Sequence, residues 1–347
     1  MGDKIYLDSS AMYPFLPVAR KAYLSAPFGN PSSEHAIGQS ARDALEHARE
    51  KIARCIGAES ESIFFTSGAT ESCQWAMQTL YENCGIIDIG DTEHHAVSEY
   101  RWNEYGKPLR ECFESGCAKM LCQNEVGTIF DVTKLHETYN IVFTDATAAV
   151  GHIPVDVSDV ELMAFSGHKF GGVLGAGVLY AKDPSILSPL IRGGGQERGI
   201  RSGTENVPAI CAMAAALEWQ CNHMEENEIN AWVCGDVFFD YFHAHLSDWK
   251  CNSPTNRIAH ILNFSFDGID AKALALILSN DGICVSTGAA CSNGLNEPSH
   301  VLMAMFHDEA RARSAIRLSF SHETTPEQCK IAAEKIVNAV KYLRSLT

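Results

Sequence analysis

The sequence predicts an α/β protein in which a mainly parallel sheet is flanked by helices and is followed by a smaller domain. Short apolar runs alternate with segments of helical periodicity over most of the chain, as in a parallel sheet covered on both faces. This pattern changes after Pro208. The 347 residues are about twice the typical domain length of roughly 150 residues. We therefore expect a large domain over residues 15–225 and a small domain formed by residues 1–14 and 226–347.

The large domain is expected to contain an amphipathic helix over residues 37–56. Its apolar side chains share one face of the helix: Ile37, Ala41, Leu45, Ala48, Ile52 and Ile56. A strand at 62–66 and a helix at 69–81 follow. Short apolar runs predict further buried strands at 86–89, 119–122, 141–144, 161–165 and 177–181. Between several of them, near 93–104 and 132–139, the pattern is helical.

A long helical region is predicted from about 208 to 246, with a break near Asn227. The remainder of the chain alternates between the two periodicities. It predicts strands at 259–266, 283–286 and 315–320, and helices at 271–280, 298–306 and 327–346. This part of the chain therefore forms a smaller α+β domain.

Net charge and hydropathy exclude several classes of partner. Lys and Arg total 27 against 43 Asp and Glu, which gives a formal net charge of −16. Such a field repels phosphate, so neither nucleic acid nor an anionic membrane is an expected partner. The longest apolar stretch, residues 209–217, is far shorter than the ~20 residues that cross a bilayer. The first residues lack the apolar run of a signal peptide, and we expect a cytoplasmic protein.

The chain contains thirteen cysteines without a secretion signal, which favours a reducing compartment over a disulfide framework. Cys112, Cys117 and Cys122 are five residues apart, a spacing that fits neither zinc nor iron–sulfur ligand patterns. No metal site is therefore expected. Most of the thiols are interpreted as small, buried apolar side chains.

The segment 65–72 carries a first candidate binding site, because it follows a predicted strand and opens a predicted helix. Small residues there leave backbone N–H groups free for an anion, and Ser67 and Thr70 add hydroxyl donors. An ordinary helix cap, with Glu71 complementing the helix dipole, explains the same residues. On its own the segment leaves phosphate binding and capping both open.

Two further candidates end predicted strands, where ligands bind in open α/β sheets. Asp145 follows the strand at 141–144, and Lys169 follows the strand at 161–165 within a glycine-containing segment. Each has an ordinary explanation, as a turn aspartate and a surface lysine. Together they supply what pyridoxal phosphate needs, an amine for a Schiff base and a carboxylate for the pyridinium nitrogen. With the 65–72 segment they favour a site for this cofactor.

On these residues and several longer blocks, the chain resembles cysteine desulfurases of the class V aminotransferases. The resemblance extends over nearly the whole chain, from 6–8 to 316–319. Its most specific blocks are 66–72, 92–94, 145–147, 166–169, 193–204 and 286–292. It implies the type I fold of pyridoxal-phosphate enzymes, whose large domain has a mainly parallel sheet of the seven-stranded type.

The resemblance implies a set of cofactor-binding residues. Lys169 would carry the cofactor and shuttle protons, Asp145 would keep the pyridine nitrogen protonated, and His94 would stack on the ring. The phosphate would be bound by Ala69, Thr70, Ser166 and His168, with Thr204 arriving from the partner subunit of a homodimer.

The resemblance also implies a substrate, L-cysteine, and a nucleophile. Asn124 and Arg317 would bind the substrate carboxylate, and Asn30 would complete the substrate-binding set. Cys291 would take the sulfur as a persulfide and release alanine. Its surroundings are small and polar, as expected of an exposed loop, whereas Cys211 lies in an apolar run typical of a structural cysteine.

Some features depart from the pattern of this family. Ala148 stands where most relatives have a glutamine, the stretch from 94 to 124 is short, and little follows Arg344. A sulfur-acceptor protein is expected as partner, in iron–sulfur assembly, tRNA thiolation or DNA phosphorothioation. Two alternatives stay open: a selenocysteine lyase or another lyase of this fold, and a non-enzymatic scaffold paralogue.

Overall fold

The computed structural model describes residues 4–101, 115–287 and 297–346, and the chain divides into two compact units. The larger unit contains Pro14–Cys122 and Phe130–Met224. The smaller unit contains Met1–Tyr13, Gln123–Ile129 and Glu225–Thr347. This division differs from the expected one by one residue at Pro14 and at Glu225, and by residues 123–129, which belong to the smaller unit rather than to the large domain.

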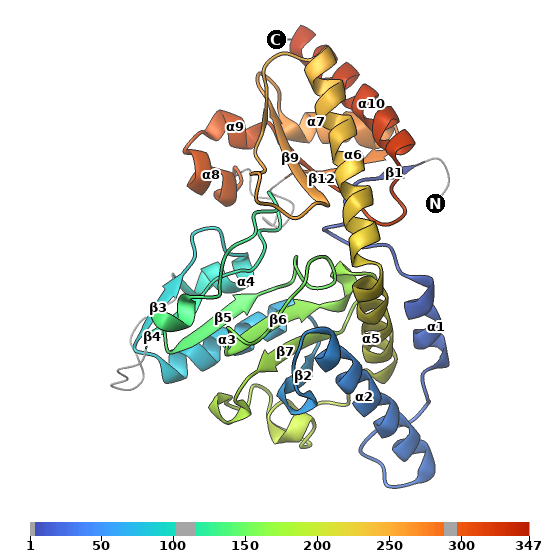
Figure 1. The fold of residues 1–347 in the computed structure, drawn as a ribbon, viewed down its shortest axis with the longest axis vertical. Coiled ribbons are helices and arrows are strands. Elements are labelled where there is room, and N and C mark those ends of the chain that lie inside the picture. The colour runs from blue at the N-terminus through green and yellow to red at the C-terminus, as the bar shows by residue number, and fades with distance from the viewer. Residues whose placement is uncertain (1–3, 102–114, 288–296, 347) are drawn as a thin grey trace. The chain divides into compact units, whose positions relative to one another are not determined.

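The larger unit is built on a sheet that has six strands among the described residues, in the order β2-β7-β6-β5-β4-β3 (Figure 1). They are β2 (Ile63–Thr66), β3 (Ile86–Ile89), β4 (Ser115–Ala118), β5 (Ile141–Asp145), β6 (Leu162–Ser166) and β7 (Gly177–Ala181). Strands β3 to β6 are parallel, and β7 runs antiparallel to both of its neighbours. The register places Asp145 beside Ala164, so β5 and β6 end close together.

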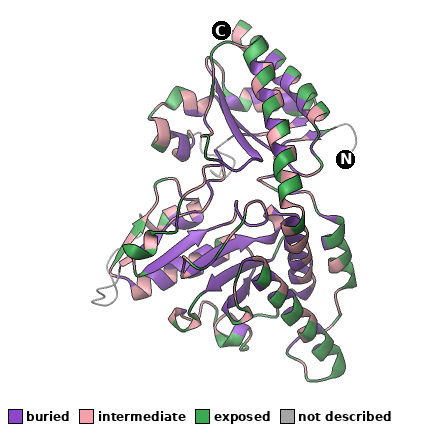
Figure 2. Cartoon of the chain, viewed as in Figure 1, coloured by how far each residue is buried: buried purple, intermediate pink, exposed green. Residues whose placement is uncertain are grey.

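The helices of the larger unit pack on this sheet and on one another. They are α1 (Pro17–Ser25), α2 (Ala36–Cys55), α3 (Ala69–Asn83), α4 (His95–Ser98) and α5 (Val207–Asn222). Helix α3 covers β5, β6 and β7, while α1 and α2 both pack against α5. Figure 2 shows the central strands of the sheet buried throughout. Trp75, Phe64 and Phe143 lie in the core between α3 and the sheet.

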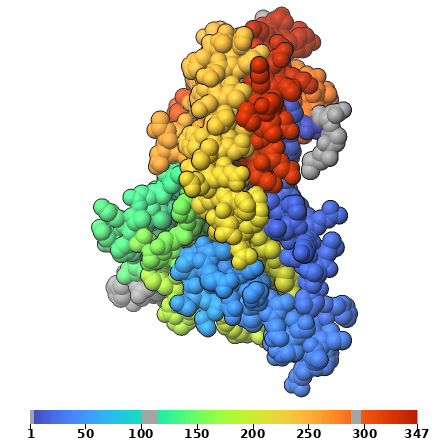
Figure 3. Space-filling view, turned by 45° about the vertical axis from the view of Figure 1, so that its right-hand side comes forward, coloured from blue at the N-terminus to red at the C-terminus, as the bar shows by residue number. Residues whose placement is uncertain are grey.

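The smaller unit has a sheet of order β11-β12-β9-β8, in which each pair of neighbours is antiparallel. Its strands are β8 (Trp249–Cys251), β9 (Ile261–Phe266), β11 (Ser286–Thr287) and β12 (Ala315–Ser319), and β1 (Ile5–Tyr6) pairs in parallel with β10 (Ile283–Cys284). Its helices are α6 (Met224–His245), α7 (Ala271–Asn280), α8 (His300–Phe306), α9 (Glu309–Arg313) and α10 (Pro326–Ser345). Helices α6 (yellow) and α10 (red) lie side by side on the surface of this unit (Figure 3).

Most predicted elements match observed ones, but two do not. Of the helix predicted near 93–104, the structure shows α4 and a 3-10 turn at Glu99–Arg101, and residues 102–104 lie outside the described ranges. The strand predicted at 119–122 lies earlier, at β4, and 119–122 is the loop that follows it. That loop is buried and hydrogen-bonded to Phe143 and Asp145, which explains its apolar character. The helix predicted at 132–139 is wrong: only a short 3-10 turn forms at Leu135–Glu137, because Val132 alone of these residues is buried and there is no apolar face to pack. Within the described ranges, no helix combines the length and apolar character needed to cross a membrane.

Candidate active site

The first part of the site is the amino end of α3, which begins at Ala69 directly after β2. Its backbone N–H groups have no earlier turn to bond, and Ala69 and Thr70 are at least partly exposed. The Thr66 hydroxyl bonds the Ser72 hydroxyl at 2.7 Å and donates to the Gly68 carbonyl at 3.1 Å. A Cβ atom on Gly177 would lie only 2.5 Å from the Gly68 backbone, so β7 packs directly beneath this turn.

Ser166 and His168 lie beside that helix end. Ser166 closes β6, and its Oγ hydrogen-bonds His168 Nδ1 at 2.8 Å. A Cβ atom on Gly68 would lie 3.7 Å from the same Oγ. Burial lowers the pKa of His168 to about 4, with a further lowering by the neighbouring Lys169 charge. His168 is therefore neutral at physiological pH, and the expected phosphate ligands of the larger unit gather at one place.

Asp145 is the last residue of β5 and is only 6% exposed. Its Oδ1 accepts a hydrogen bond from the Thr147 backbone N–H at 2.9 Å. The Cys73 thiol lies nearby on α3; burial first, and then the Asp145 charge, raise the pKa of Cys73 well above its usual range. The carboxylate is thus buried and is held by the turn that follows β5.

Lys169 ends the 3-10 turn Gly167–Lys169, which directly follows β6. Its backbone carbonyl accepts a hydrogen bond from His152 Nε2 at 2.9 Å. Burial lowers the pKa of His152 to about 4, so this ring is neutral and acts as a fixed donor. The Lys169 side chain is partly exposed, and it starts from a backbone position that is fixed by this hydrogen bond.

His94 is the N-cap of α4, where its Nδ1 accepts a hydrogen bond from the Ala96 backbone N–H at 3.1 Å. Burial lowers the pKa of His94; the nearby Asp145 charge raises it and the Lys169 charge lowers it again. The ring therefore lies within electrostatic reach of both residues. Since Nδ1 is an acceptor, the proton of the neutral ring is on Nε2. His95, by contrast, faces Glu99 at 3.6 Å.

The glycine-rich segment 193–204 is anchored rather than free, and a glutamate is its main anchor. Glu197 forms a buried ion pair with Arg49 at 2.8 Å and accepts the Phe65 backbone N–H at 2.8 Å. Arg201 binds Glu71 at 2.7 Å. Burial alone would raise the pKa of Glu71, but hydrogen bonds from Arg201 and Ser67 outweigh it and lower the pKa.

The smaller unit brings together Arg317, Asn124 and Asp8. Arg317, on β12, is 6% exposed; its Nη1 donates to the Asn124 carbonyl and its Nη2 to Asp8 Oδ1, both at 2.8 Å. Its Nε is buried and has no hydrogen-bond partner among the described residues. Asp8 thus already balances part of the charge, and Nε is the guanidinium nitrogen left without a described partner, as a donor for an anion.

Glu125, beside Asn124, is 6% exposed and belongs to the same unit. Its Oε2 accepts a hydrogen bond from Ser299 Oγ at 2.6 Å, and Ser299 is the N-cap of α8. Burial raises the pKa of Glu125 to about 7, although the Ser299 hydrogen bond and the Arg317 charge oppose the rise. This carboxyl changes its protonation near neutral pH.

Two expected site residues, Asn30 and Thr204, are exposed on loops of the larger unit. Asn30 lies in the loop before α2, and its Oδ1 accepts a hydrogen bond from the Ser32 backbone N–H at 2.9 Å within that loop. Thr204 is the last residue of the anchored 193–204 segment, shortly before α5. Cys291 lies outside the described residues.

Several residues of the site were not found from the sequence: Asp8, Cys73, Glu125, His152 and Glu197. Asp8 belongs to the block 6–8 that carries the resemblance, and Glu125 directly follows Asn124. Their positions in the sequence were therefore the signal that could have identified them as site residues. Cys73 resembles any small buried residue of an amphipathic helix. His152 and Glu197 act through contacts that only the folded chain creates.

The larger unit combines an open helix end with hydroxyl and imidazole groups, a buried carboxylate, a lysine and a neutral histidine. This set fits pyridoxal phosphate: the helix end, Ser166 and His168 suit the phosphate, and the buried Asp145 carboxylate suits a protonated ring nitrogen. Lys169 supplies the amine. All of these residues belong to one unit, so the fit does not depend on the other.

Comparison with known proteins gives consistent matches over the full length. The family model described as Aminotransferase class-V matches residues 5–107 and 117–331. The chain is 36% identical over 382 residues to a protein named cysteine desulfurase IscS from Dictyoglomus turgidum, covering 100% of this chain and 97% of the relative.

Solved structures agree with this match. A NifS-like protein superposes with a TM-score of 0.88 at 29% identity, over 98% of this chain and 100% of that one. A structure described as SspA in complex with cysteine gives a TM-score of 0.76 at 27% identity, over 91% and 98% of the two chains. The expected fold is confirmed, and the chain belongs to the aminotransferase class V family.

Proposed function

We propose that this chain is a pyridoxal-phosphate-dependent cysteine desulfurase that converts L-cysteine to L-alanine and holds the sulfur as a persulfide on Cys291. The observation that carries the proposal is the group formed by Lys169, Asp145 and His94 around the carboxyl ends of β5 and β6. An amine, a buried carboxylate and a neutral imidazole within electrostatic reach of one another are the groups that this chemistry requires. The names of the matched relatives support the same activity.

The larger unit would hold the cofactor. The proposed phosphate ligands are Ala69, Thr70, Ser166 and His168. Asp145 would accept a hydrogen bond from the protonated ring nitrogen. When bound, the cofactor supplies an electron sink for the charge that develops on the substrate α-carbon. Thr204 is proposed to complete the phosphate site from the partner subunit of a homodimer.

The chain's own groups would move the protons. The Lys169 backbone is held by His152, and Nζ is the atom proposed to take and return a proton. The proton of neutral His94 is on Nε2, and this atom is the proposed donor to the substrate. Because burial lowers the pKa of His94, the ring is neutral when it stacks on the cofactor.

The sulfur transfer itself would use the Cys291 thiolate. Its sulfur attacks the substrate sulfur; the S–S bond forms as the substrate C–S bond breaks, and the electron pair passes to carbon. Protonation of that carbon gives alanine. A sulfur-acceptor protein then takes the sulfur from the persulfide.

Arg317 is proposed to bind the substrate carboxylate through the N–H that has no partner among the described residues. Asn124 orients the guanidinium through its carbonyl, and its side-chain amide is proposed as a second ligand. Asn30 stays in the proposed substrate-binding set, although its own hydrogen bond is local.

The test uses purified protein loaded with pyridoxal phosphate, L-cysteine and a reductant, and measures sulfide and alanine together. Wild type should produce both in equal amounts. Lys169→Ala should lose turnover completely, because no other amine replaces it, whereas Lys182→Ala, which removes a partly exposed lysine paired with Glu161, should leave turnover unchanged. Turnover retained by Lys169→Ala would refute the proposal.

Cys291→Ser separates desulfurase from lyase activity. The serine variant should bind cofactor and substrate but form no persulfide, since a hydroxyl is a far weaker nucleophile than a thiolate. Cys211→Ser, at a partly buried thiol on α5, is the matched control and should behave as wild type. Normal sulfide release by Cys291→Ser would favour a selenocysteine lyase or another lyase instead.

Thr204→Ala tests the proposed homodimer. The loss of one charged hydrogen bond, worth about 1.5–3 kcal/mol, should weaken cofactor retention without unfolding the chain. Mixed with Lys169→Ala, it should give heterodimers with one doubly damaged and one intact site, which restores activity. Without restoration after proven subunit exchange, Thr204 does not act across the interface.

A further inference from the structure

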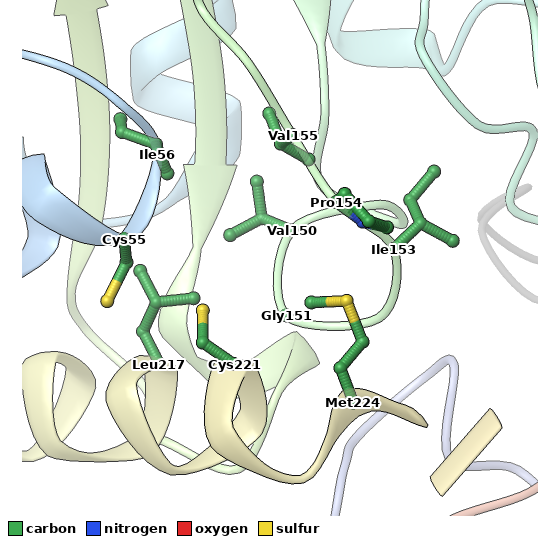
Figure 4. A pocket seen from close by; sticks show the side chains of 10 residues that line it. All are labelled: Cys55, Ile56, Val150, Gly151, Ile153, Pro154, Val155, Leu217, Cys221 and Met224. Carbon is green, nitrogen blue, oxygen red and sulfur yellow. The ribbon is translucent and has the colours of Figure 1, made fainter. Parts of the chain in front are cut away.

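The larger unit contains a pocket of about 300 Å³ away from the proposed cofactor site (Figure 4). It lies where the carboxyl ends of α2 and α5 meet the segment that follows β5. Most of its lining is apolar, including Ile56, Val150, Val155 and Leu217. Two thiols, Cys55 and Cys221, also line it and are both partly exposed.

The two thiols are neighbours in the pocket. Cys55 is the last residue of α2, Cys221 lies in the last turn of α5, and Figure 4 shows both side chains at the pocket wall. They lie close enough for each thiol to shift the pKa of the other. One turn earlier on each helix, Lys51 and Glu218 form an ion pair at 2.8 Å. The two helices are therefore tied together beside the thiols, and the approach of the sulfurs is built into the packing.

We propose that Cys55 and Cys221 form a redox-active dithiol site that takes hydroperoxides from the pocket and closes to a disulfide between α2 and α5. Neither residue belongs to the proposed cofactor or substrate machinery.

The reaction needs one hydroperoxide for each disulfide. The Cys221 sulfur attacks the outer peroxide oxygen; the O–O bond breaks, and a sulfenic acid and an alcohol or water result. The Cys55 sulfur then attacks the sulfenic sulfur, the S–S bond forms and water leaves. Both thiols are oxidised, and the peroxide is reduced by two electrons.

The order of the two steps follows from the influence of each thiol on the other. The neighbouring Cys55 lowers the pKa of Cys221, although burial and Glu218 oppose this, and Cys221 together with burial raises the pKa of Cys55. Cys221 is therefore the thiol that reaches the reactive thiolate first, and Cys55 is the resolving thiol.

The smaller unit provides a control, because Cys234 on α6 and Cys329 on α10 are also neighbouring thiols, and the pKa of Cys234 is lowered and that of Cys329 raised by the other member of the pair. Both of these residues are 0% exposed. A hydroperoxide reaches them only when the packing of the two helices opens. The two pairs thus share neighbouring thiols and differ in access.

The experiment treats the cofactor-loaded protein with hydrogen peroxide, blocks remaining thiols with iodoacetamide and maps the peptides by mass spectrometry. The disulfide-linked peptide of Cys55 and Cys221 should form, at least about tenfold faster than that of Cys234 and Cys329. A thiol reductant should reverse it. In Cys55→Ser, oxidation should stop at a Cys221 sulfenic acid that dimedone traps, whereas Cys221→Ser should leave Cys55 largely alkylated.

Two results would overturn the proposal. Complete alkylation of Cys55 and Cys221 after peroxide treatment would show a structural contact without redox chemistry. Equal rates for the two pairs would show that oxidation follows general opening of the protein and needs no pocket. Both results are measured on the wild-type protein, so they do not depend on whether the Cys55→Ser and Cys221→Ser variants fold.

Discussion

Replacing Glu125 with glutamine should remove a pH dependence of stability that this one carboxyl imposes. The side chain is 6% exposed, and burial raises the pKa of Glu125 from 4.5 to about 7 against the opposing Ser299 hydrogen bond and Arg317 charge. Glutamine has nearly the same shape and stays neutral. Its carbonyl oxygen still accepts the Ser299 hydroxyl.

The magnitude follows from the difference between the folded and unfolded pKa. The unfolded chain loses the proton near 4.5 and the folded chain near 7, so between these values the folded state binds more protons. Stability is therefore highest below the unfolded pKa, falls as the pH rises through this window, and levels off above the folded pKa. The full loss is about 3 kcal/mol, of which about 2 kcal/mol falls between about pH 5.5 and about pH 7.5.

The assay is urea unfolding at the two pH values, followed by tryptophan fluorescence, since Trp232 and Trp249 pack against the core of the same unit. Relative to wild type, Glu125→Gln should gain about 2 kcal/mol on going to the higher pH. Glu334→Gln, exposed on α10, is the control and should show no such gain. Infrared spectra near pH 6 should show a protonated carboxyl band in wild type that is missing in Glu125→Gln.

Ser299→Ala supplies a second test of the same reasoning. It removes the hydrogen bond that holds the pKa of Glu125 down, so the pH-dependent loss should extend to higher pH. Equal pH dependence in wild type and Glu125→Gln would refute the argument, because the carboxyl would then be ionised at both pH values or neutral at both.

Two further predictions concern the larger unit. Glu197→Ala removes the buried partner of the Arg49 guanidinium and leaves it only the half-exposed Glu46, so it should destabilise the fold by up to about 3–5 kcal/mol in urea unfolding, with much of the loss recovered when Arg49 is replaced by Met as well. Gly177→Ala places a methyl 2.5 Å from the Gly68 backbone, so the amino end of α3 must move. Overpacking of this kind costs about 1–3 kcal/mol, and titration with pyridoxal phosphate should show binding weakened by about tenfold or more; unchanged affinity would show that this helix end does not bind the phosphate.

The sequence predicts those parts of the fold that are encoded locally. The helix at 37–56 has a clear helical periodicity and the strand at 177–181 is an apolar run, and both form within one residue of the prediction. Asp145 and Lys169 were found because each directly follows an apolar run, and parallel strands bring such residues to one edge. The local pattern was sufficient for these two residues, because a residue at the carboxyl end of a parallel strand lies at the ligand-binding edge of the sheet.

The parts that were missed depend on distant partners. Strand β8 forms because it pairs with β9, for example Trp249 with Phe266. It has only three residues, which is too short for a periodic pattern in the sequence. The boundary of the smaller unit was missed at 123–129 because this short segment is held by tertiary bonds, such as Asn263 Nδ2 to the Glu125 carbonyl. The raised pKa of Glu125 arises from burial, which no local pattern near that residue reveals.

The pairing of β1 with β10 imposes an order on the folding of this chain during its translation. Ile5 is translated before the whole larger unit, whereas its partner Ile283 is translated after it. At roughly 5–20 residues per second, β1 waits on the order of a quarter of a minute to a minute for its neighbour. All segments of the larger unit emerge during that interval. The larger unit can thus fold first. During that time β1 stays attached to it as an unpaired segment, until β10 has been translated.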